Sequence, residues 1–241
     1  MSIAGTNYFY FIIVLPPVLV LFYCINKFVK QDSHAQRILL VSIALFFVRV
    51  MLLLFADSIG VMPRVRPELA FYSLLAVFGV LFSFGNVKLI EKRTLTFFGW
   101  TSGNLVKNVL IGLLGLLPLI AFLPVIYFTT HFAISSEVTI EKIVLASTFG
   151  LILGGFYEEV MFRGIIQFHV EQITTKNRAM VYTAIIFVLT HVGYLPFDAF
   201  GIYYWFLLIM ALELSYVRSR YNAISCAVLH GGIVFFLILL V

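Results

Sequence analysis

The sequence predicts an all-α fold: a polytopic membrane helix bundle of about eight transmembrane helices, with both termini on the outer face of the membrane. The 241 residues are 62% hydrophobic and only 11% charged, and their mean hydropathy is +1.08. Soluble domains are roughly half apolar and a quarter charged. The residues between the charges form apolar runs of about 20 residues, the length of a helix that crosses a bilayer. Lys and Arg gather in alternate connections between these runs.

Each apolar run is expected to be a helix, because backbone groups in lipid must find hydrogen-bond partners within their own segment. The candidate spans cover roughly residues 8–26, 38–56, 69–87, 108–130, 143–168, 179–195, 201–217 and 222–241. The connections are short and no internal repeat is visible. Residues 1–241 are therefore predicted to form a single transmembrane domain.

The orientation prediction rests on loop charges, since Lys and Arg accumulate on the cytoplasmic side. The odd-numbered connections hold eleven of them: Lys27, Lys30, Arg37, Lys88, Lys92, Arg93, Lys107, Lys176, Arg178, Arg218 and Arg220. The even-numbered connections hold three: Arg64, Arg66 and Lys142. This imbalance places both termini outside. The net charge of +5 is then a signal of topology and of contact with anionic lipid, and nucleic-acid binding is not predicted.

Ionisable residues inside spans are energetically costly, and they tend to face the bundle interior as partners or functional groups. Here they are Arg49, Glu158, Glu159, Arg163, His191, Glu213 and His230. All but Arg49 belong to the last four spans. Arg49 and Glu213 are expected to pair across the second and seventh spans, or Arg49 to reach the interface with its long side chain.

The run GGFYEEVMFRG in the fifth span concentrates three of these charges. Glu159 and Arg163 are four residues apart, in the order that favours an ion pair on one helix face. Glu158 is offset from Glu159 by about 100° around the helix, so it points elsewhere. One carboxylate is thus left to act as a base, since burial and nearby cations can tune such a group for proton transfer near neutral pH.

His191 and His230 add imidazoles from the sixth and eighth spans. Together with Glu158 they predict a site that activates water. The same three residues are a familiar zinc set and are the ligands we would assign to a divalent metal, although the HExxH motif is absent. No cofactor is predicted, and a metal is the less favoured alternative. Neither a GxSxG serine motif nor a pair of intramembrane Asp residues is present.

At these residues the sequence resembles the CPBP family, also called the CAAX protease and bacteriocin-processing or ABI family, which consists of intramembrane glutamic-type endopeptidases. The family carries E-E-x-x-x-R, F-x-x-x-H and H-x-x-x-N/D motifs in consecutive membrane helices. The first matches EEVMFR at Glu158–Arg163, the second matches FVLTH from Phe187 to His191, and the third begins at His230. By this resemblance residues 143–241 carry the motif core, and residues 1–142 supply supporting helices.

The resemblance implies roles for the motif residues. Glu158 would be the general base that activates water, His191 would hold and polarise that water, and His230 would stabilise the oxyanion. Glu159, Arg163 and Phe187 would support the site. One position departs from the pattern: four residues after His230, where the family has Asn or Asp, this sequence has Val234, which cannot donate a side-chain hydrogen bond.

The predicted function is hydrolysis of peptide bonds in membrane-tethered peptides or protein C-terminal tails, by a multi-pass protein of a prokaryotic inner membrane. The partners expected are membrane lipid and the tethered substrate. The alternative is an inactive family member that serves as an immunity factor or membrane scaffold, which the change at Val234 favours. A proton-coupled transporter would predict inverted repeats or paired broken helices, and the sequence offers neither.

Overall fold

The computed structural model describes the backbone of residues 4–58, 66–101, 103–130, 137–191 and 200–240. It describes the side chains of residues 16–48, 76–101, 103–126, 128, 137–191 and 201–240. Every regular element in these ranges is a helix, so the predicted all-α class is confirmed. The expected partnership of Arg49 with Glu213 lies outside the described side chains.

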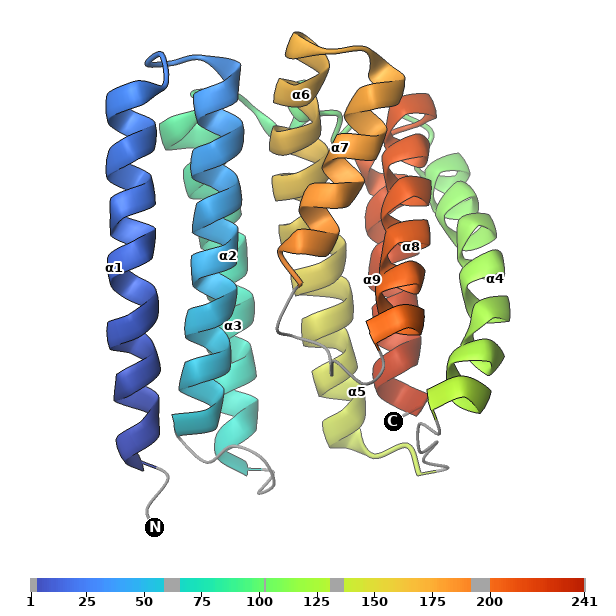
Figure 1. Cartoon of the computed structure of the whole chain (residues 1–241). Coiled ribbons are helices and arrows are strands. Elements are labelled where there is room, and N and C mark those ends of the chain that lie inside the picture. The colour runs from blue at the N-terminus through green and yellow to red at the C-terminus, as the bar shows by residue number, and fades with distance from the viewer. Residues whose placement is uncertain (1–3, 59–65, 102, 131–136, 192–199, 241) are drawn as a thin grey trace.

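The elements follow the order of the predicted spans. They are α1 (Ala4–Phe28), α2 (His34–Ser58), α3 (Arg66–Gly85), η1 (Asn86–Ile90), η2 (Leu95–Phe98), α4 (Leu105–Thr130), α5 (Ile140–Ala146), η3 (Ser147–Glu158), η4 (Val160–Ile166), α6 (Gln167–Ile173), α7 (Lys176–Leu189), α8 (Phe200–Arg220) and α9 (Ala223–Leu240). Figure 1 shows α1, α2 and α3 gathered on one side of the molecule and the later helices on the other.

Within the described part, three helices are long and apolar enough to cross a bilayer: Leu105–Ile126, Ile140–Ile173 and Ala223–Leu240. Shorter apolar stretches at Pro16–Phe28, His34–Val48 and Ala76–Ile90 belong to α1, α2 and the α3–η1 segment. These three helices are the candidate membrane spans of the described part of the chain. Eight spans and an outer location for the termini stay predictions.

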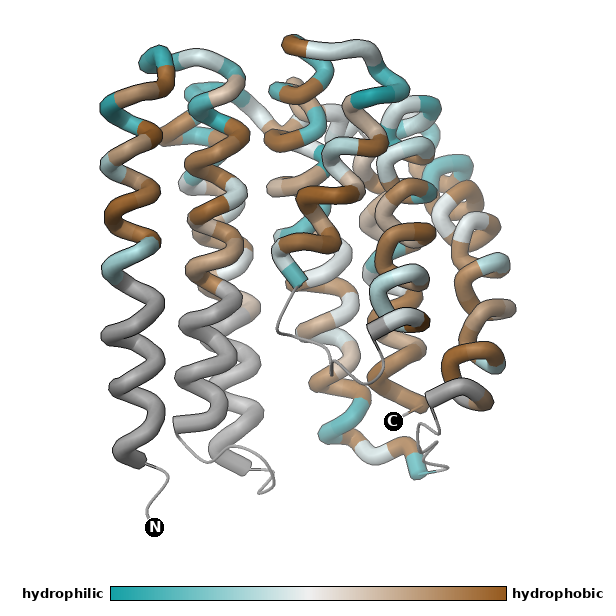
Figure 2. Tube along the Cα trace, viewed as in Figure 1, coloured by the Kyte–Doolittle hydropathy of each residue, from teal (hydrophilic) through white to brown (hydrophobic). Residues whose placement is uncertain are grey.

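Both termini lie at the same end of the bundle (Figure 1). The turns that follow α1, α3, α6 and α8 lie at the opposite end, and these are the basic connections of the sequence. Figure 2 shows hydrophilic residues concentrated near those turns, with hydrophobic residues prevailing along the helices. This is the distribution expected of helices whose middle sections face lipid.

The fifth predicted span is one continuous helix from Ile140 to Ile173. Its central part, Ser147–Glu158 and Val160–Ile166, has the i→i+5 hydrogen bonds of a π-helix, which differs from the α-helical spacing predicted from the sequence. π-helical turns are rare and occur frequently at functional sites. Here they cover the GGFYEEVMFRG run except Glu159, which is α-helical.

Glycines let this π-helical segment cross α9 with the two backbones in contact. A Cβ added to Gly155 would lie 2.8 Å from the carbonyl oxygen of Ala227, and one added to Gly150 would lie 2.8 Å from that of Gly231. No larger residue fits such a crossing without moving a backbone. The glycines beside the first and third motifs therefore serve helix packing, and they bring His230 against the carboxylates of the fifth span.

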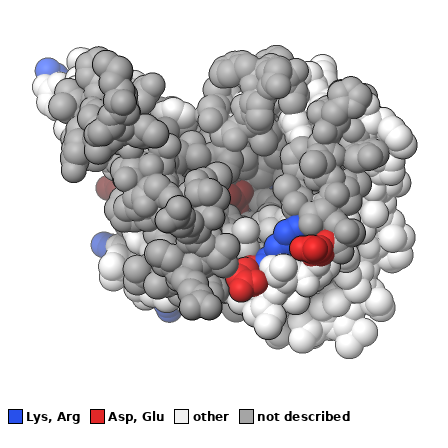
Figure 3. All heavy atoms as spheres, turned by 90° about the horizontal axis from the view of Figure 1, so that it is seen from below, with Lys and Arg blue, Asp and Glu red and all other residues white. Residues whose placement is uncertain are grey.

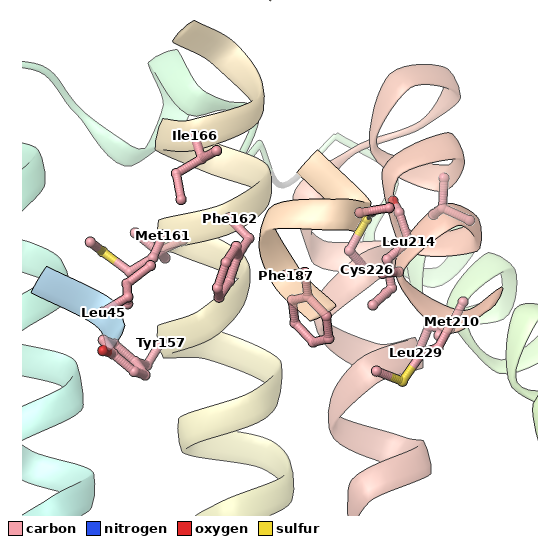
Figure 4. Packing of buried hydrophobic residues seen from close by; sticks show 14 of the residues in the cluster. Leu45, Tyr157, Met161, Phe162, Ile166, Phe187, Met210, Leu214, Cys226 and Leu229 are labelled. Carbon is pink, nitrogen blue, oxygen red and sulfur yellow. Dashed lines mark hydrogen bonds between the residues drawn. The ribbon is translucent and has the colours of Figure 1, made fainter. Parts of the chain in front are cut away.

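The buried core lies around the same segment. Phe162 and Phe187 are fully buried and point toward each other in Figure 4, with ring centroids 4.9 Å apart. On the other side of the helix, Met161 and Tyr157 lie toward Leu45 of α2 (Figure 4). Apolar packing thus fixes the rotation of the fifth-span helix and, with it, the direction in which its acidic residues point.

Candidate active site

The predicted ion pair exists and is completely buried. Arg163 Nη1 donates to Glu159 Oε1 at 3.1 Å, and neither side chain is exposed. The guanidinium also donates through Nη2 to the carbonyl oxygen of Ala211 at 3.3 Å. Its central carbon lies 4.6 Å from the ring centroid of Phe187. A buried charge needs such compensation, since an unpaired one would cost several kcal/mol.

Glu159 also holds His230. The imidazole Nδ1 and Glu159 Oε1 are 2.7 Å apart, and both groups are buried. Because a carboxylate can only accept a hydrogen bond, Nδ1 carries the hydrogen and donates. This contact fixes the ring orientation and turns Nε2 toward Glu158. Glu159 therefore acts on the site through His230, a link that spacing along one helix could not reveal.

His191 lies at a helix end, which differs from its predicted place near the middle of a span. Described helix α7 stops at Leu189, and Thr190 forms its C-cap. The Thr190 hydroxyl donates to the carbonyl oxygen of Phe187 at 2.8 Å, and His191 Nδ1 lies 2.7 Å from the same oxygen. Two polar side chains thereby donate to one carbonyl in the last turn of the helix, where backbone donors run out.

The hydrogen bond to the Phe187 carbonyl sets the tautomer of His191 as well. Nδ1 must donate, so Nε2 is left facing Glu158. The rings of Phe187 and His191 are packed with centroids 4.4 Å apart, which confirms that the two residues of the second motif share one face. Phe187 also lies against His230, at 5.5 Å between centroids.

The three predicted catalytic residues converge on one point. Glu158 Oε2 lies 3.8 Å from His230 Nε2 and 4.0 Å from His191 Nε2. These separations are too long for direct hydrogen bonds. They suit a bridging water molecule that contacts all three groups. Among the described residues, no three His, Cys, Asp or Glu side chains are arranged to hold a metal ion.

A cavity of about 260 Å³ opens beside this point. Apart from Glu158, His191 and His230 its walls are almost wholly apolar, and they come from η3, α8, α9 and α2. The other lining residues are Val48, Phe149, Leu153, Gly154, Tyr157, Phe206, Leu207, Met210, Val234 and Leu237. Seen from the end that carries both termini, acidic side chains are visible in and beside a hollow of the surface (Figure 3).

Val234 is part of the cavity wall, on the same helix as His230. An Asn or Asp at this position would present a polar group to the cavity; valine presents methyl groups. The apolar wall residues Val48, Phe206 and Met210 were missed by sequence reasoning, because apolar residues in apolar spans carry no signal that separates a cavity wall from a lipid-facing surface.

A second polar cluster, which was not predicted from the sequence, links α2 to α6. His34 Nδ1 and His169 Nδ1 are 2.8 Å apart, and His169 Nε2 lies 3.1 Å from Glu91 Oε2. The two histidines are 135 residues apart in the chain. The cluster ties an N-terminal helix to the helix that carries the first motif.

Comparison with known protein families gives a match over the site. The family model described as type II CAAX prenyl endopeptidase Rce1-like matches residues 140–236, the stretch that contains all three motifs. No curated protein and no solved structure matched the chain.

Proposed function

Residues 140–236 are a type II CAAX prenyl endopeptidase Rce1-like domain of the CPBP family, and on that premise we propose that the protein is an intramembrane endopeptidase in which Glu158 activates water. The observation that carries the proposal is the convergence of Glu158, His191 and His230 at separations of 3.8 and 4.0 Å, which one bridging water molecule can span. Glu158 and His230 lie on two separate helices and His191 lies just past the end of α7, and the three meet beside a cavity that can admit a peptide side chain.

In the proposed reaction a water molecule lies between Glu158 Oε2 and the two imidazole Nε2 atoms. Glu158 removes a proton as the water oxygen attacks the scissile carbonyl, which forms the new C–O bond. The tetrahedral intermediate then breaks its C–N bond, and Glu158 returns the proton to the leaving amine. The products are a carboxylic acid and an amine. A positioned general base of this kind contributes about 10²–10⁴ in rate.

His230 is proposed to stabilise the oxyanion. In its protonated form Nε2 donates a hydrogen bond toward the cavity, and Glu159 is the counter-ion at Nδ1. Arg163 in turn keeps Glu159 in place and compensates its charge. This order of groups resembles the arrangement in which a buried carboxylate orients a catalytic histidine and stabilises its charged form. Glu159 and Arg163 are therefore positioning residues.

The proposed substrates are peptides or C-terminal tails that are already tethered to the membrane. The apolar cavity walls favour a hydrophobic segment over a charged one. The family description names a CAAX prenyl endopeptidase, so a prenylated CAAX peptide is the first candidate. An acylated peptide without a prenyl group is the second.

The test uses the full-length protein in liposomes with both peptides, in water enriched in ¹⁸O. Hydrolysis places one ¹⁸O in the new carboxyl group, which mass spectrometry detects. We expect Glu158→Gln to lower the rate by about 10²–10⁴. Glu213→Gln is the matched control, because Glu213 is a second glutamate inside the bundle that lies toward Gly115 of α4 and does not line the cavity. Equal cleavage by wild type and Glu158→Gln would refute the assigned base.

A second candidate function is a non-catalytic membrane protein, an immunity factor or scaffold that keeps the polar cluster. The observation in its favour is Val234 in the cavity wall, where a hydrogen-bond donor is missing. Absence of cleavage of both peptides by the wild type, together with activity gained in Val234→Asn, would support this reading.

A further inference from the structure

A shallow pocket of about 460 Å³ lies at the end of α3, at the end of the bundle opposite both termini. It is lined by Lys88, Lys92, Arg93, Thr94 and Phe97, and we refer to its three cations as the basic patch. All three cationic side chains are exposed. The pocket shares no lining residue with the cavity at Glu158.

The charge of the basic patch is not neutralised within the segment that carries it. Residues 86–104 contain a single acid, Glu91. Its side chain is turned inward and buried, with Oε2 3.1 Å from His169 Nε2. Among the side chains that the structure describes, Lys88, Lys92 and Arg93 form no ion pair. The three positive charges therefore face outward around one hollow.

The backbone at Lys92 gives a second, independent reason to regard the pocket as a built feature. Lys92 has φ of +53°, the left-handed conformation, at the turn that ends η1. The turn is closed by the amide of Arg93, which donates to the carbonyl oxygen of Val87 at 2.9 Å. Glycine or asparagine usually fills such a position, because other residues pay a steric cost there. A lysine at this turn places a cation at the pocket despite that cost.

Apolar side chains flank the basic patch on the surface. Leu89 is 77% exposed, and Ile90 and Phe97 are also exposed. The Arg93 guanidinium carbon lies 4.6 Å from the Phe97 ring centroid, which holds the cation over the aromatic face. Cations beside exposed apolar and aromatic groups, at the end of helices that cross a bilayer, are the combination expected where headgroups meet acyl chains.

Two simpler accounts explain only part of this arrangement. Basic residues at a helix C-terminus complement the helix dipole, yet that effect fades within one turn and calls for no pocket. The preference for basic residues in cytoplasmic loops explains their sign. It does not explain why three of them surround one hollow together with Phe97.

We propose that the basic patch binds the phosphate headgroup of an anionic membrane phospholipid, whose acyl chains lie along Leu89 and Ile90. The phosphate oxygens accept hydrogen bonds from the two ammonium groups and the guanidinium, as charge-assisted contacts. The cytoplasmic leaflet, where these connections are predicted to lie, is the anionic one. The proposal is independent of the proposed proteolysis.

The test compares two variants of the full-length protein that lose the same charge. Lys88→Gln/Lys92→Gln/Arg93→Gln removes the basic patch, and Lys107→Gln/Lys176→Gln/Arg178→Gln removes three exposed cations from the beginnings of α4 and α7 at the same end. Binding of phosphatidylglycerol is measured by native mass spectrometry and by the thermal shift in nanodiscs of phosphatidylcholine with increasing phosphatidylglycerol. All six side chains are exposed, so both variants are expected to fold.

We expect the patch variant to bind phosphatidylglycerol about 100-fold more weakly than the wild type, from roughly 1 kcal/mol for each cation near the headgroup. The control variant should change binding by less than about threefold. Equal losses in the two variants would show that only total charge matters and would overturn the proposal. Competition by soluble inorganic phosphate as effective as that by the lipid would also overturn it, because the ligand would then be free phosphate.

Discussion

The crossing of the π-helical segment with α9 yields a sharp prediction for Gly155→Ala. The added Cβ would lie 2.8 Å from the carbonyl oxygen of Ala227, while ordinary van der Waals contacts begin at 3.4 Å. The two backbones must therefore separate locally by about 0.6 Å, the difference between those values. Overpacking of this kind costs about 1–3 kcal/mol.

The matched control is Gly85→Ala at the end of α3. Gly85 is also helical, with φ of −57°, and an added Cβ there has nothing within 4 Å. Both substitutions gain the same intrinsic helix preference of alanine over glycine, roughly 1 kcal/mol. The difference in unfolding free energy between the two variants then measures the cost of the added methyl group at the helix crossing alone. We expect Gly155→Ala to be the less stable variant by about 1–3 kcal/mol.

Chemical denaturation of the two variants in detergent micelles measures this difference. The same substitution should also slow cleavage about tenfold, because it displaces His230 from Glu158 and a shift of about 1 Å in a reacting group can cost about 100-fold. Equal unfolding free energies for Gly155→Ala and Gly85→Ala would refute the close crossing, and with it the account of how His230 reaches the site.

Three other expectations follow from the buried groups. Arg163→Met leaves Glu159 as an uncompensated buried charge and should lower the unfolding free energy by about 3–5 kcal/mol, whereas adding Glu159→Met should recover part of that loss in a denaturation experiment. Val234→Asn supplies the missing donor and should raise the cleavage rate by about 10²–10³ if the oxyanion lacks one; an unchanged rate with a folded variant would mean that another donor serves. His169→Leu leaves Glu91 with a buried oxygen and no imidazole partner, so it should cost about 1–3 kcal/mol, with a change near zero arguing that the cluster does not hold α2 to α6.

Several local relations of the site were predictable from spacing. The Glu159–Arg163 pair follows from residues four apart on one helix, and the packing of Phe187 on His191 follows from the same spacing carried just past the end of α7; both are present. The separate direction of Glu158 was also predicted from its offset around the helix. It faces the two imidazole Nε2 atoms, whereas Glu159 faces Arg163.

Other relations depend on where helices end and cross, and spacing does not contain that information. The sixth predicted span extended to residue 195, and apolar character alone could not show that described helix α7 stops at Leu189. The hydrogen bond of Glu159 to His230 joins groups 71 residues apart. It depends on the close approach at Gly155, which the sequence indicated only as a pair of glycines.

The contribution of α2 to the cavity has a consequence for how substrate choice could diverge. Val48 lies outside the stretch of the chain that matches the family, yet it forms part of the wall beside Glu158. The motif residues and their hydrogen-bond partners all belong to the later helices. Substitutions in the first helices could therefore change which peptide substrates enter the cavity without altering the proposed catalytic residues. Substrate selection and catalysis could in this way diverge separately.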